Sequence, residues 1–430
     1  MADNGLDSDV YWKSASTTSY NVTPTFQTPG ATTLPPQLVL FNTIIRATIN
    51  SPNSNFCAWG NGCAHGENIA RSAFSWHEDN QPTSDVSRTT NSNSPIVIYN
   101  NADVETKCRA ETWGGYSGGR GFRVNMVDQD ATAYICHKSL RFGDAPWMSG
   151  SIAVPQADET TLQIAMPFAP DWIWIWSNVY GGDEWISPYY ATSATWTESF
   201  SHRDGTYENW GMWDEDNQNY TDSETLYSQS ACGKIPVNGV DYAVRIKTLT
   251  WNDNGVVADW ENGNNTLGYR YHFIAGKNAN SKVGNFILST SAPGDDAEYR
   301  ASDGTIKITT GFKPKMVFFI GGNRSTEGIS NHITMGRGFA GEADEWAMAM
   351  SIQDNDNTSD VYCGQWNERC FARLAYNSTT LNDYCSLNAM EDDGFRVNLD
   401  DAGSYAISYL AMGDPPAKLV LPYQPSILRV

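Results

Sequence analysis

Apolar and polar side chains alternate through the segment DGFRVNLDDAGSYAISYLAMGD, in the last third of the chain. A period of two residues is typical of a β-strand with one buried face. The Asp, Ala and Gly residues in the middle of the segment favour a turn. The pattern therefore predicts an antiparallel hairpin whose apolar side chains face a second sheet. These side chains are Phe395, Val397, Leu399, Tyr405, Ile407 and Tyr409.

The same pattern occurs three times. A proline followed by a strongly β-forming run is found in LPPQLVLF, FAPDWIWIW and FKPKMVFFI, at Pro36, Pro170 and Pro314. Each run is followed, in the same order, by an aromatic segment that enters an acidic turn and by a hairpin of the kind described above. The prolines lie roughly 140 residues apart, which is a domain-sized interval. The sequence thus indicates a triplicated domain rather than a solenoid of short repeats.

Each repeated unit has the character of a β-sandwich. No long segment has helical periodicity, and each unit has about eight short strand-like runs separated by turn signals. We predict an all-β protein with three tandem antiparallel β-sandwiches of the jelly-roll or lectin-like type, at residues 1–145, 146–279 and 280–430. A C-terminal tail from about residue 415 is expected to cap a sheet edge or to pair with a neighbouring chain. The alternative is one large β-protein with generically similar hairpins.

Composition adds a strong constraint from charge. The chain has 28 Lys and Arg against 49 Asp and Glu, so its formal net charge is −21. Such an acidic chain repels nucleic acid and anionic membranes, and we expect neither as a direct partner. The first residues have no basic region followed by an apolar run, so we expect no secretory signal. No apolar run approaches the length of a membrane span.

The eight cysteines raise the question of disulfides. Alignment of the repeats puts Cys108 opposite Ile246 and Cys385, and a position that accepts Ile is apolar and buried. Equivalent positions in separate sandwiches are poorly placed to pair with each other. We therefore predict reduced cysteines in the cores. The alternatives are the local bridges Cys57–Cys63 and Cys363–Cys370.

The acidic turn is the chemical feature common to all three units. Clustered Asp and Asn residues on a loop can supply several of the six to eight oxygen ligands that calcium takes. They are also good turn formers, and none of the three turns has the spacing of an EF-hand. We therefore expect either turn chemistry without a cofactor or a calcium site. The metal candidates are Asp79, Asp85, Asp216, Asp222, Asp356 and Asp360.

No motif indicates catalysis. The carboxylates lie in repeated turns, whereas a catalytic pair occupies one unique cleft. GYSGG matches the G-x-S-x-G pattern at Ser117, but a strand follows where a nucleophile elbow needs a helix. GRGFAG matches G-x-G-x-x-G at Gly336, Gly338 and Gly341 outside any βαβ unit, and we interpret it as a flexible loop. We expect the protein not to be an enzyme.

The 16 tryptophans are the remaining candidates for binding. Trp172, Trp174 and Trp176 alternate along one face of a strand and are predicted to be core residues. Others lie in Gly- and Asn-rich segments, where an aromatic ring beside polar groups is typical of sugar-binding surfaces, protein interfaces and sandwich cores alike. The ligand or interface candidates are Trp59, Trp113, Trp185 and Trp210.

The order GFKPKMVFF, DGFRVNL and YAISYLAMGD resembles tandem β-sandwich domains in structural proteins of tailed bacteriophages. Those domains have an early G-F-x-P-x-x-V strand, a late D-G-F strand and a final Y-x-A-x-G strand. The third unit carries the match at Gly311, Phe312, Pro314, Val317, Asp393, Gly394, Phe395, Tyr409, Ala411 and Gly413. The second unit keeps Phe168 and Pro170 but has NGVVADW in place of D-G-F, and the first keeps Gly121 and Phe122 but has Leu34 in place of the early Phe.

A second, weaker resemblance is to H-type lectin domains, which are also small sandwiches with an early Pro-led strand and a late G-F-x-V strand. None of that family's sugar-binding residues can be placed on this chain. The resemblance to phage proteins implies a non-enzymatic virion structural protein, assembled in the host cytoplasm and exposed on the particle surface. A head decoration or cement protein is the first expectation. The alternatives are a tail-fibre or receptor-binding protein that recognises host glycans, and a free-standing lectin.

The partners expected from this interpretation are other virion proteins, either the major capsid protein or tail components, and further copies of the chain. Host glycans are the additional partner under the alternatives. An acidic surface would keep many copies soluble until they dock. A symmetric homo-oligomer, for example a trimer, is the expected state.

Overall fold

The structure is a computed structural model. It describes residues 6–14, 19–25, 36–45, 49–52, 56–65, 70–78, 86–91, 94–99, 104–113, 121–128, 133–154, 160–178, 193–215, 223–237, 240–262, 270–353 and 360–415. Within these ranges all the named elements are β-strands, arranged in six antiparallel sheets. None of the described residues forms a helix that could cross a membrane. The prediction of an all-β protein built from β-sandwiches is confirmed.

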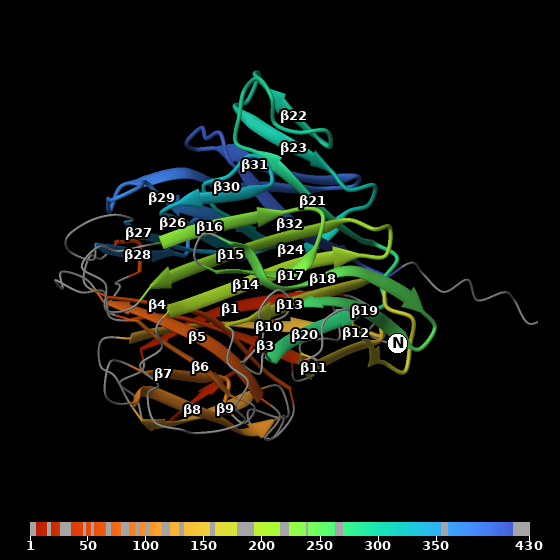
Figure 1. Cartoon of the computed structure of the whole chain (residues 1–430). Coiled ribbons are helices and arrows are strands. Elements are labelled where there is room, and N and C mark those ends of the chain that lie inside the picture. The colour runs from red at the N-terminus through yellow and green to blue at the C-terminus, as the bar shows by residue number, and fades with distance from the viewer. Residues whose placement is uncertain are drawn as a thin grey trace, which may run out of the picture.

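Sandwich 1 pairs a six-stranded sheet, in the order β1-β10-β3-β4-β5-β6, with a four-stranded sheet, in the order β2-β9-β8-β7. Its strands are β1 (Asp7–Ser14), β2 (Ser19–Val22), β3 (Leu38–Ile45), β4 (Phe56–Ala64), β5 (Ala70–Glu78), β6 (Val86–Asn91), β7 (Ile96–Tyr99), β8 (Val104–Trp113), β9 (Phe122–Asp128) and β10 (Ala133–Arg141). Figure 1 shows this sandwich in red to orange at the bottom of the molecule.

Sandwich 2 repeats this arrangement, in yellow to green across the middle of Figure 1. Its larger sheet has the order β11-β20-β13-β14-β15-β16 followed by one added strand, and its smaller sheet has the order β12-β19-β18-β17. The strands are β11 (Trp147–Ala153), β12 (Thr160–Ala165), β13 (Trp172–Ser177), β14 (Ser193–His202), β15 (Tyr207–Glu215), β16 (Ser223–Ser228), β17 (Cys232–Val237), β18 (Val240–Asn252), β19 (Gly255–Asn262) and β20 (Arg270–Gly276).

Sandwich 3 has the same plan with two additional strands, β22 on its smaller sheet and β25, which is the strand added to sandwich 2. Its sheets have the orders β21-β32-β24-β26-β27-β28 and β22-β23-β31-β30-β29. The strands are β21 (Ser281–Ile287), β22 (Ala297–Arg300), β23 (Thr305–Thr309), β24 (Pro314–Gly321), β25 (Gly328–Asn331), β26 (Ile333–Gly341), β27 (Glu345–Ile352), β28 (Val361–Trp366), β29 (Phe371–Leu374), β30 (Leu381–Glu391), β31 (Gly394–Leu399) and β32 (Ala406–Gly413).

The strand order of the three sandwiches matches position by position. In each one the first strand pairs with the last, the last pairs with the Pro-led strand, and a meander of three strands follows. This correspondence makes β4, β14 and β26 equivalent, and likewise β6, β16 and β28. The predicted boundaries near residues 145 and 279 fall in the connections between β10 and β11 and between β20 and β21.

The predicted hairpin at the end of sandwich 3 is wrong in its pairing. Its two strands, β31 and β32, lie in opposite sheets, where β31 pairs with β23 and β30 while β32 pairs with β21 and β24. Six residues separate Leu399 from Ala406, enough for the chain to cross from one sheet to the other. The predicted burial largely survives, because the side chains meet across the sandwich instead of along one sheet. Phe395, Val397, Ile407 and Tyr409 are buried together, whereas Leu399 and Tyr405 are only partly buried.

Each six-stranded sheet has apolar residues on both faces. Along β13, Ile173 and Ile175 point into the core of sandwich 2, while Trp172, Trp174 and Trp176 point the other way into a second core. This second core contains buried residues of all three sandwiches, such as Leu40 and Phe318, and we call it the shared core. The three larger sheets therefore pack against one another.

Neighbouring sandwiches meet through equivalent strands in a cyclic order. Strand β4 lies against β28, β26 lies against β16, and β14 lies against β6. The connection between β3 and β4 forms a parallel bridge from Ile49 to Gln365 of β28, and β25, between β24 and β26, pairs with β16. The chain thus has an approximate threefold arrangement formed by one polypeptide.

The G-x-G-x-x-G match is a strand and not a flexible loop. Gly336, Gly338 and Gly341 lie in β26, and a Cβ at Gly338 would stand 1.7 Å from the carbonyl oxygen of Cys370. At the equivalent place in sandwich 1, a Cβ at Gly62 would stand 1.5 Å from the carbonyl oxygen of Pro95. Glycine is needed at these positions because the smaller sheet approaches the larger one closely there.

Candidate functional site

The shared core is built in layers from equivalent positions of the three sandwiches. On β4, β14 and β26, the side chains that point inward alternate with those that point into each sandwich. One layer consists of Trp59, Trp196 and Met335, and a second consists of Cys63, Phe200 and Phe339. Between these apolar layers lies one polar layer, made of Asn61, Glu198 and Arg337, which we call the central triad.

The central triad is buried and internally hydrogen-bonded. Glu198 is 0% exposed and Arg337 is 3% exposed. Arg337 forms an ion pair with the Glu198 carboxylate through Nη2, and its Nη1 donates to Oδ1 of Asn61 at 3.0 Å. Asn61 Nδ2 donates to Glu198 Oε1 at 3.2 Å, and the same oxygen accepts the indole N–H of Trp174 at 2.9 Å. A charged pair is tolerated in such an interior only when its members satisfy each other in this way.

A second cation lies in the shared core. Lys138 of β10 is 2% exposed, donates to Oδ1 of Asn42, and places its ammonium 3.6 Å from the ring centroid of Trp346. Burial, together with the nearby charge of Arg337, lowers the pKa of Lys138 to about 8. Asn42 in turn donates to Oδ1 of Asn61 at 2.6 Å, so the lysine is connected to the central triad.

A second buried carboxylate holds sandwiches 2 and 3 together. Glu208 of β15 is 0% exposed and accepts hydrogen bonds from Tyr227 at 2.8 Å, Ser408 at 2.6 Å and Asn285 at 2.7 Å. Burial raises the pKa of Glu208, although these hydrogen bonds oppose the shift. Because Ser408 and Asn285 belong to sandwich 3, the carboxylate bridges two sandwiches.

Two of the four tryptophans predicted as ligand or interface residues, Trp59 and Trp210, are wrong as sites for a soluble ligand. Trp59 and Trp210 are both 0% exposed and lie in the shared core, so neither offers a ring face to a soluble sugar. Trp210 stacks on Tyr227 with ring centroids 4.4 Å apart and donates its indole N–H to Ser408 at 2.8 Å. Trp185 and the side chain of Trp113 lie outside the described residues.

The structure tests the acidic turns only in part. Of the six Asp residues predicted as metal ligands, Asp360 lies in the described part of the chain, and its carbonyl accepts the backbone N–H of Gln353 at 3.1 Å. Asp79, Asp85, Asp216, Asp222 and Asp356 lie outside it. In the described ranges no three His, Cys, Asp or Glu side chains are grouped as metal ligands would be.

The cysteines whose side chains are described are buried, and no two of them form a disulfide with each other. The pairing of Cys363 with Cys370 is not formed, because Cys370 instead lies beside Cys385, with the two sulfur atoms 3.6 Å apart. Ile246 of sandwich 2 occupies the strand position of Cys385 and is also fully buried, as the repeat alignment predicted. The side chains of Cys57 and Cys108 lie outside the description.

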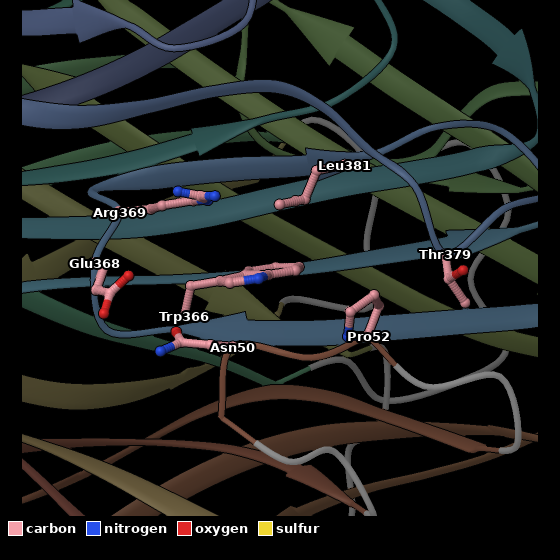
Figure 2. Close-up of a pocket in the computed structure, with 7 residues that line it drawn as sticks. All are labelled: Asn50, Pro52, Trp366, Glu368, Arg369, Thr379 and Leu381. Atoms are coloured by element: carbon pink, nitrogen blue, oxygen red, sulfur yellow. The ribbon is translucent and has the colours of Figure 1, made fainter.

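One surface pocket lies between sandwiches 1 and 3. It has a volume of about 300 Å³, and its lining residues, shown in Figure 2, are Asn50, Pro52, Trp366, Glu368, Arg369, Thr379 and Leu381. Asn50 fixes the wall from sandwich 1. Its backbone N–H donates to Gln365 at 2.8 Å, and its side chain exchanges two hydrogen bonds with Asn367, at 2.7 and 3.1 Å.

The pocket combines one aromatic ring with several polar groups. Trp366, which is 3% exposed, lies between Arg369 and Pro52 in Figure 2. The Arg369 guanidinium lies 4.2 Å from the ring centroid of Tyr384, and its Nε is buried without a hydrogen-bond partner. Because the ring is buried, the groups that a ligand would meet are the amide, carboxylate, guanidinium and hydroxyl groups, which can hydrogen-bond to a small polyhydroxylated ligand.

Sequence reasoning did not identify the central triad. The available signal is local, because each triad residue is a polar side chain flanked two positions away on both sides by apolar ones. Glu198 lies between Trp196 and Phe200, for example. A polar residue inside an apolar face of a strand indicates a buried polar contact when a partner exists. The partners come from other sandwiches, so the contact itself is invisible to the pattern of one strand.

Comparison with known proteins leaves the family open. No protein-family model matches the chain, and no curated protein matches it. Among solved structures, the crystal structure of the LG1-3 region of the laminin alpha2 chain was aligned over 93% of this chain and 92% of that chain. The identity is 8% and the TM-score is 0.08, so this likeness carries no argument about fold or function.

Proposed function

We propose that this chain is a non-enzymatic structural protein on the surface of a tailed-bacteriophage particle, in first place a head decoration protein. The observation that carries the proposal is the shared core, which joins three sandwiches of the same plan into one body. A body of this kind provides large, fixed outer faces for docking to other subunits. The resemblance of the third unit to tandem sandwiches of phage structural proteins supports the same conclusion.

The test is to localise the protein on particles. Purified protein is added to particles that lack it, and bound copies are imaged by electron microscopy and counted against capsid subunits. A decoration protein is expected to bind at a fixed number of copies per capsid lattice unit. Labelling confined to the tail, or no binding to either part of the particle, would overturn the assignment to the head.

A second candidate function is recognition of host glycans, which would fit a tail-fibre or receptor-binding protein. The specific observation in its favour is the pocket at Trp366 and Arg369, whose lining carries amide, carboxylate, hydroxyl and guanidinium groups. A polyhydroxylated ligand could accept a hydrogen bond from Arg369 through a hydroxyl oxygen.

A glycan array with purified protein decides between these functions. The glycan interpretation predicts a binding signal that Arg369→Ala reduces by roughly tenfold, a loss equivalent to about 1.4 kcal/mol. Arg203→Ala is the matched control, because Arg203 is an exposed arginine of sandwich 2 away from the pocket. A blank array with the wild-type protein excludes the array glycans as ligands and leaves the structural role.

A further inference from the structure

We propose that the central triad makes the sandwich-to-sandwich surfaces selective, so that each six-stranded sheet fits the two other sandwiches of its own chain and disfavours an identical sandwich from a second copy. The inference concerns how the body assembles and does not depend on where the protein acts. It rests on Asn61, Glu198 and Arg337 as equivalent positions that carry three different kinds of side chain.

The equivalence of the three positions follows from strand register. Glu198 pairs with Trp176 on the Pro-led strand of sandwich 2, and Arg337 pairs with Ile320 on that of sandwich 3. Trp176 and Ile320 each stand six residues after the proline, at Pro170 and Pro314.

Sandwich 1 follows the same rule. Asn42 stands six residues after Pro36, and the register of β3 with β4 places Asn61 beside it. Asn42 Nδ2 donates to Asn61 Oδ1 at 2.6 Å, which confirms that the two side chains are neighbours. The three residues of the triad therefore occupy the same strand position in the three sandwiches.

The chemistry of the triad is complementary only when one of each residue is present. Arg337 donates to both other members, Glu198 accepts from both, and Asn61 does one of each. Two copies of sandwich 2 would place two carboxylates at the centre, and two copies of sandwich 3 would place two guanidinium groups there. Like charges in a buried site repel strongly and leave hydrogen-bonding groups unpaired, so identical neighbours are disfavoured.

The seams between sandwiches share one layout, although their side chains differ. The residue four positions after each triad member contacts the first strand of the next sandwich. His65 lies against Trp147 with ring centroids 5.4 Å apart, and His202 Nε2 lies 3.3 Å from Ser281 Oγ. In the third seam a Cβ at Gly341 would stand 2.4 Å from Ser8 Oγ. These side chains and the pairing of β25 with β16 add to the fit of each sandwich, and the triad is the feature that places opposite charges at the centre.

The test compares wild type with the apolar double variant Glu198→Leu/Arg337→Met. An apolar replacement removes the charges without leaving one of them unpaired, so the sandwiches are expected to fold. Two copies with different tags are unfolded together in urea and refolded, and species that carry both tags are quantified by tandem affinity capture and light scattering. We expect the apolar variant to form roughly ten times more mixed-tag species than wild type, which corresponds to about 1.4 kcal/mol of lost discrimination.

A matched control is available inside one sandwich. Arg373 and Asp383 form a buried ion pair within the smaller sheet of sandwich 3, away from the seams. Arg373→Met/Asp383→Asn removes that pair and keeps a residue at position 383 that tolerates its positive φ of 52°. This control is expected to lower stability while leaving mixed-tag species at the wild-type level.

Each outcome decides the proposal. If the apolar variant folds and stays as unmixed as wild type, the triad does not select partners and the proposal is overturned. If the apolar variant does not fold, Glu198→Gln/Arg337→Gln is used instead, because it removes both charges and keeps polar groups that can hydrogen-bond with each other in the interior. A rise in mixed species for this neutral double variant supports the proposal, and a wild-type level overturns it.

Discussion

The core inside each sandwich and the core shared between sandwiches are built on opposite faces of the same strands, yet they differ in chemistry. The core of sandwich 2 is formed largely by aliphatic residues such as Ile173, Val244 and Ile246. The shared core is dominated by Trp, Met and Phe, and in addition it buries the central triad and Lys138. Neighbouring residues on one strand therefore pack in cores of different composition.

The difference indicates that the two cores have different roles. Apolar packing is strong but not directional, and inside one sandwich the order of the strands is already set by their connections. Between sandwiches of equal plan, packing alone leaves several arrangements open. Buried hydrogen bonds and ion pairs restrict those arrangements, since an unsatisfied polar group is costly in an interior.

The largest expected effect is a loss of folding stability at low pH, caused by a histidine in the core of sandwich 1. His137 of β10 points into sandwich 1, where its Nε2 accepts the Tyr20 hydroxyl at 2.5 Å and its Nδ1 donates to the Tyr11 carbonyl at 3.2 Å. Burial lowers the pKa of His137 to about 3. Because this pKa lies below the unfolded value, the unfolded chain binds the proton first. Stability present above about pH 6.5 is then lost as the pH falls toward 3, by roughly 5 kcal/mol when complete.

The measurement is urea unfolding of wild type and His137→Gln between pH 7 and 4. Glutamine can keep an acceptor for Tyr20 and a donor for Tyr11 but does not titrate in this range. Taking the difference between the two proteins removes the contribution of buried carboxyls such as Asp9, whose pKa burial raises to about 6. A difference that does not change with pH would mean that the histidine has the same pKa in the folded and unfolded states.

The next prediction compares the loss of stability caused by substituting two adjacent residues of β13. Trp174→Ala removes a ring that packs on Phe318 of sandwich 3, with centroids 4.9 Å apart, and it takes away one hydrogen-bond donor to Glu198. Ile175→Ala opens a cavity inside sandwich 2 only. Large-to-small changes of these kinds destabilise by about 3–5 kcal/mol for Trp and 2–5 kcal/mol for Ile.

Hydrogen exchange distinguishes the two variants although their energies overlap. Trp174→Ala is expected to reduce backbone protection in strands that border the shared core in more than one sandwich, including β24. Ile175→Ala is expected to reduce protection within sandwich 2, including β18, whose Val244 packs in the same core. Identical exchange patterns for the two variants would show that the two cores unfold as one unit.

The sequence was sufficient for the fold class because strand periodicity and turns are local. The Pro-led runs, the acidic turns and the final pair of strands each occur once per sandwich, and they revealed three units of one plan. The pairing of the last two strands was not predictable in the same way. Alternation shows which face of β31 or β32 is buried, but it is the same whether the strands pair in one sheet or face each other across two.

The burial of the sheet face that packs in the shared core was also not predictable from the sequence of single strands. Trp59 and Trp210 lie among Gly and Asn residues, a setting shared by exposed binding surfaces and by strands that another domain covers. Whether such a face is exposed to solvent depends on how the sandwiches pack against each other. The sequence of one strand does not show this packing. The same applies to Glu198 and Arg337, because their partners lie on other repeats.

The smallest of the three effects concerns Lys138, the neighbour of His137 that points into the shared core. Burial lowers its pKa to about 8, so below that pH the folded state holds a buried cation at a disadvantage relative to the unfolded chain. Lys138→Met removes this penalty and also the contacts with Asn42 and Trp346. We expect a net gain in stability of about 1–3 kcal/mol at pH 7.

The sign of the pH dependence tests this explanation of Lys138. The folded pKa lies below the unfolded value of about 10.4, so the wild type gains stability relative to the variant as the pH rises from 8 toward 10. Urea unfolding of both proteins at pH 7, 8, 9 and 10 gives this difference, and thiols and tyrosines that titrate in both proteins cancel from it. An advantage of Lys138→Met that stays constant over this range would mean that the lysine keeps its ordinary pKa and that only packing has changed. An advantage that shrinks would show that the shared core holds a charge that its apolar layers disfavour, in contrast to the sandwich core one residue away, where His137 is neutral.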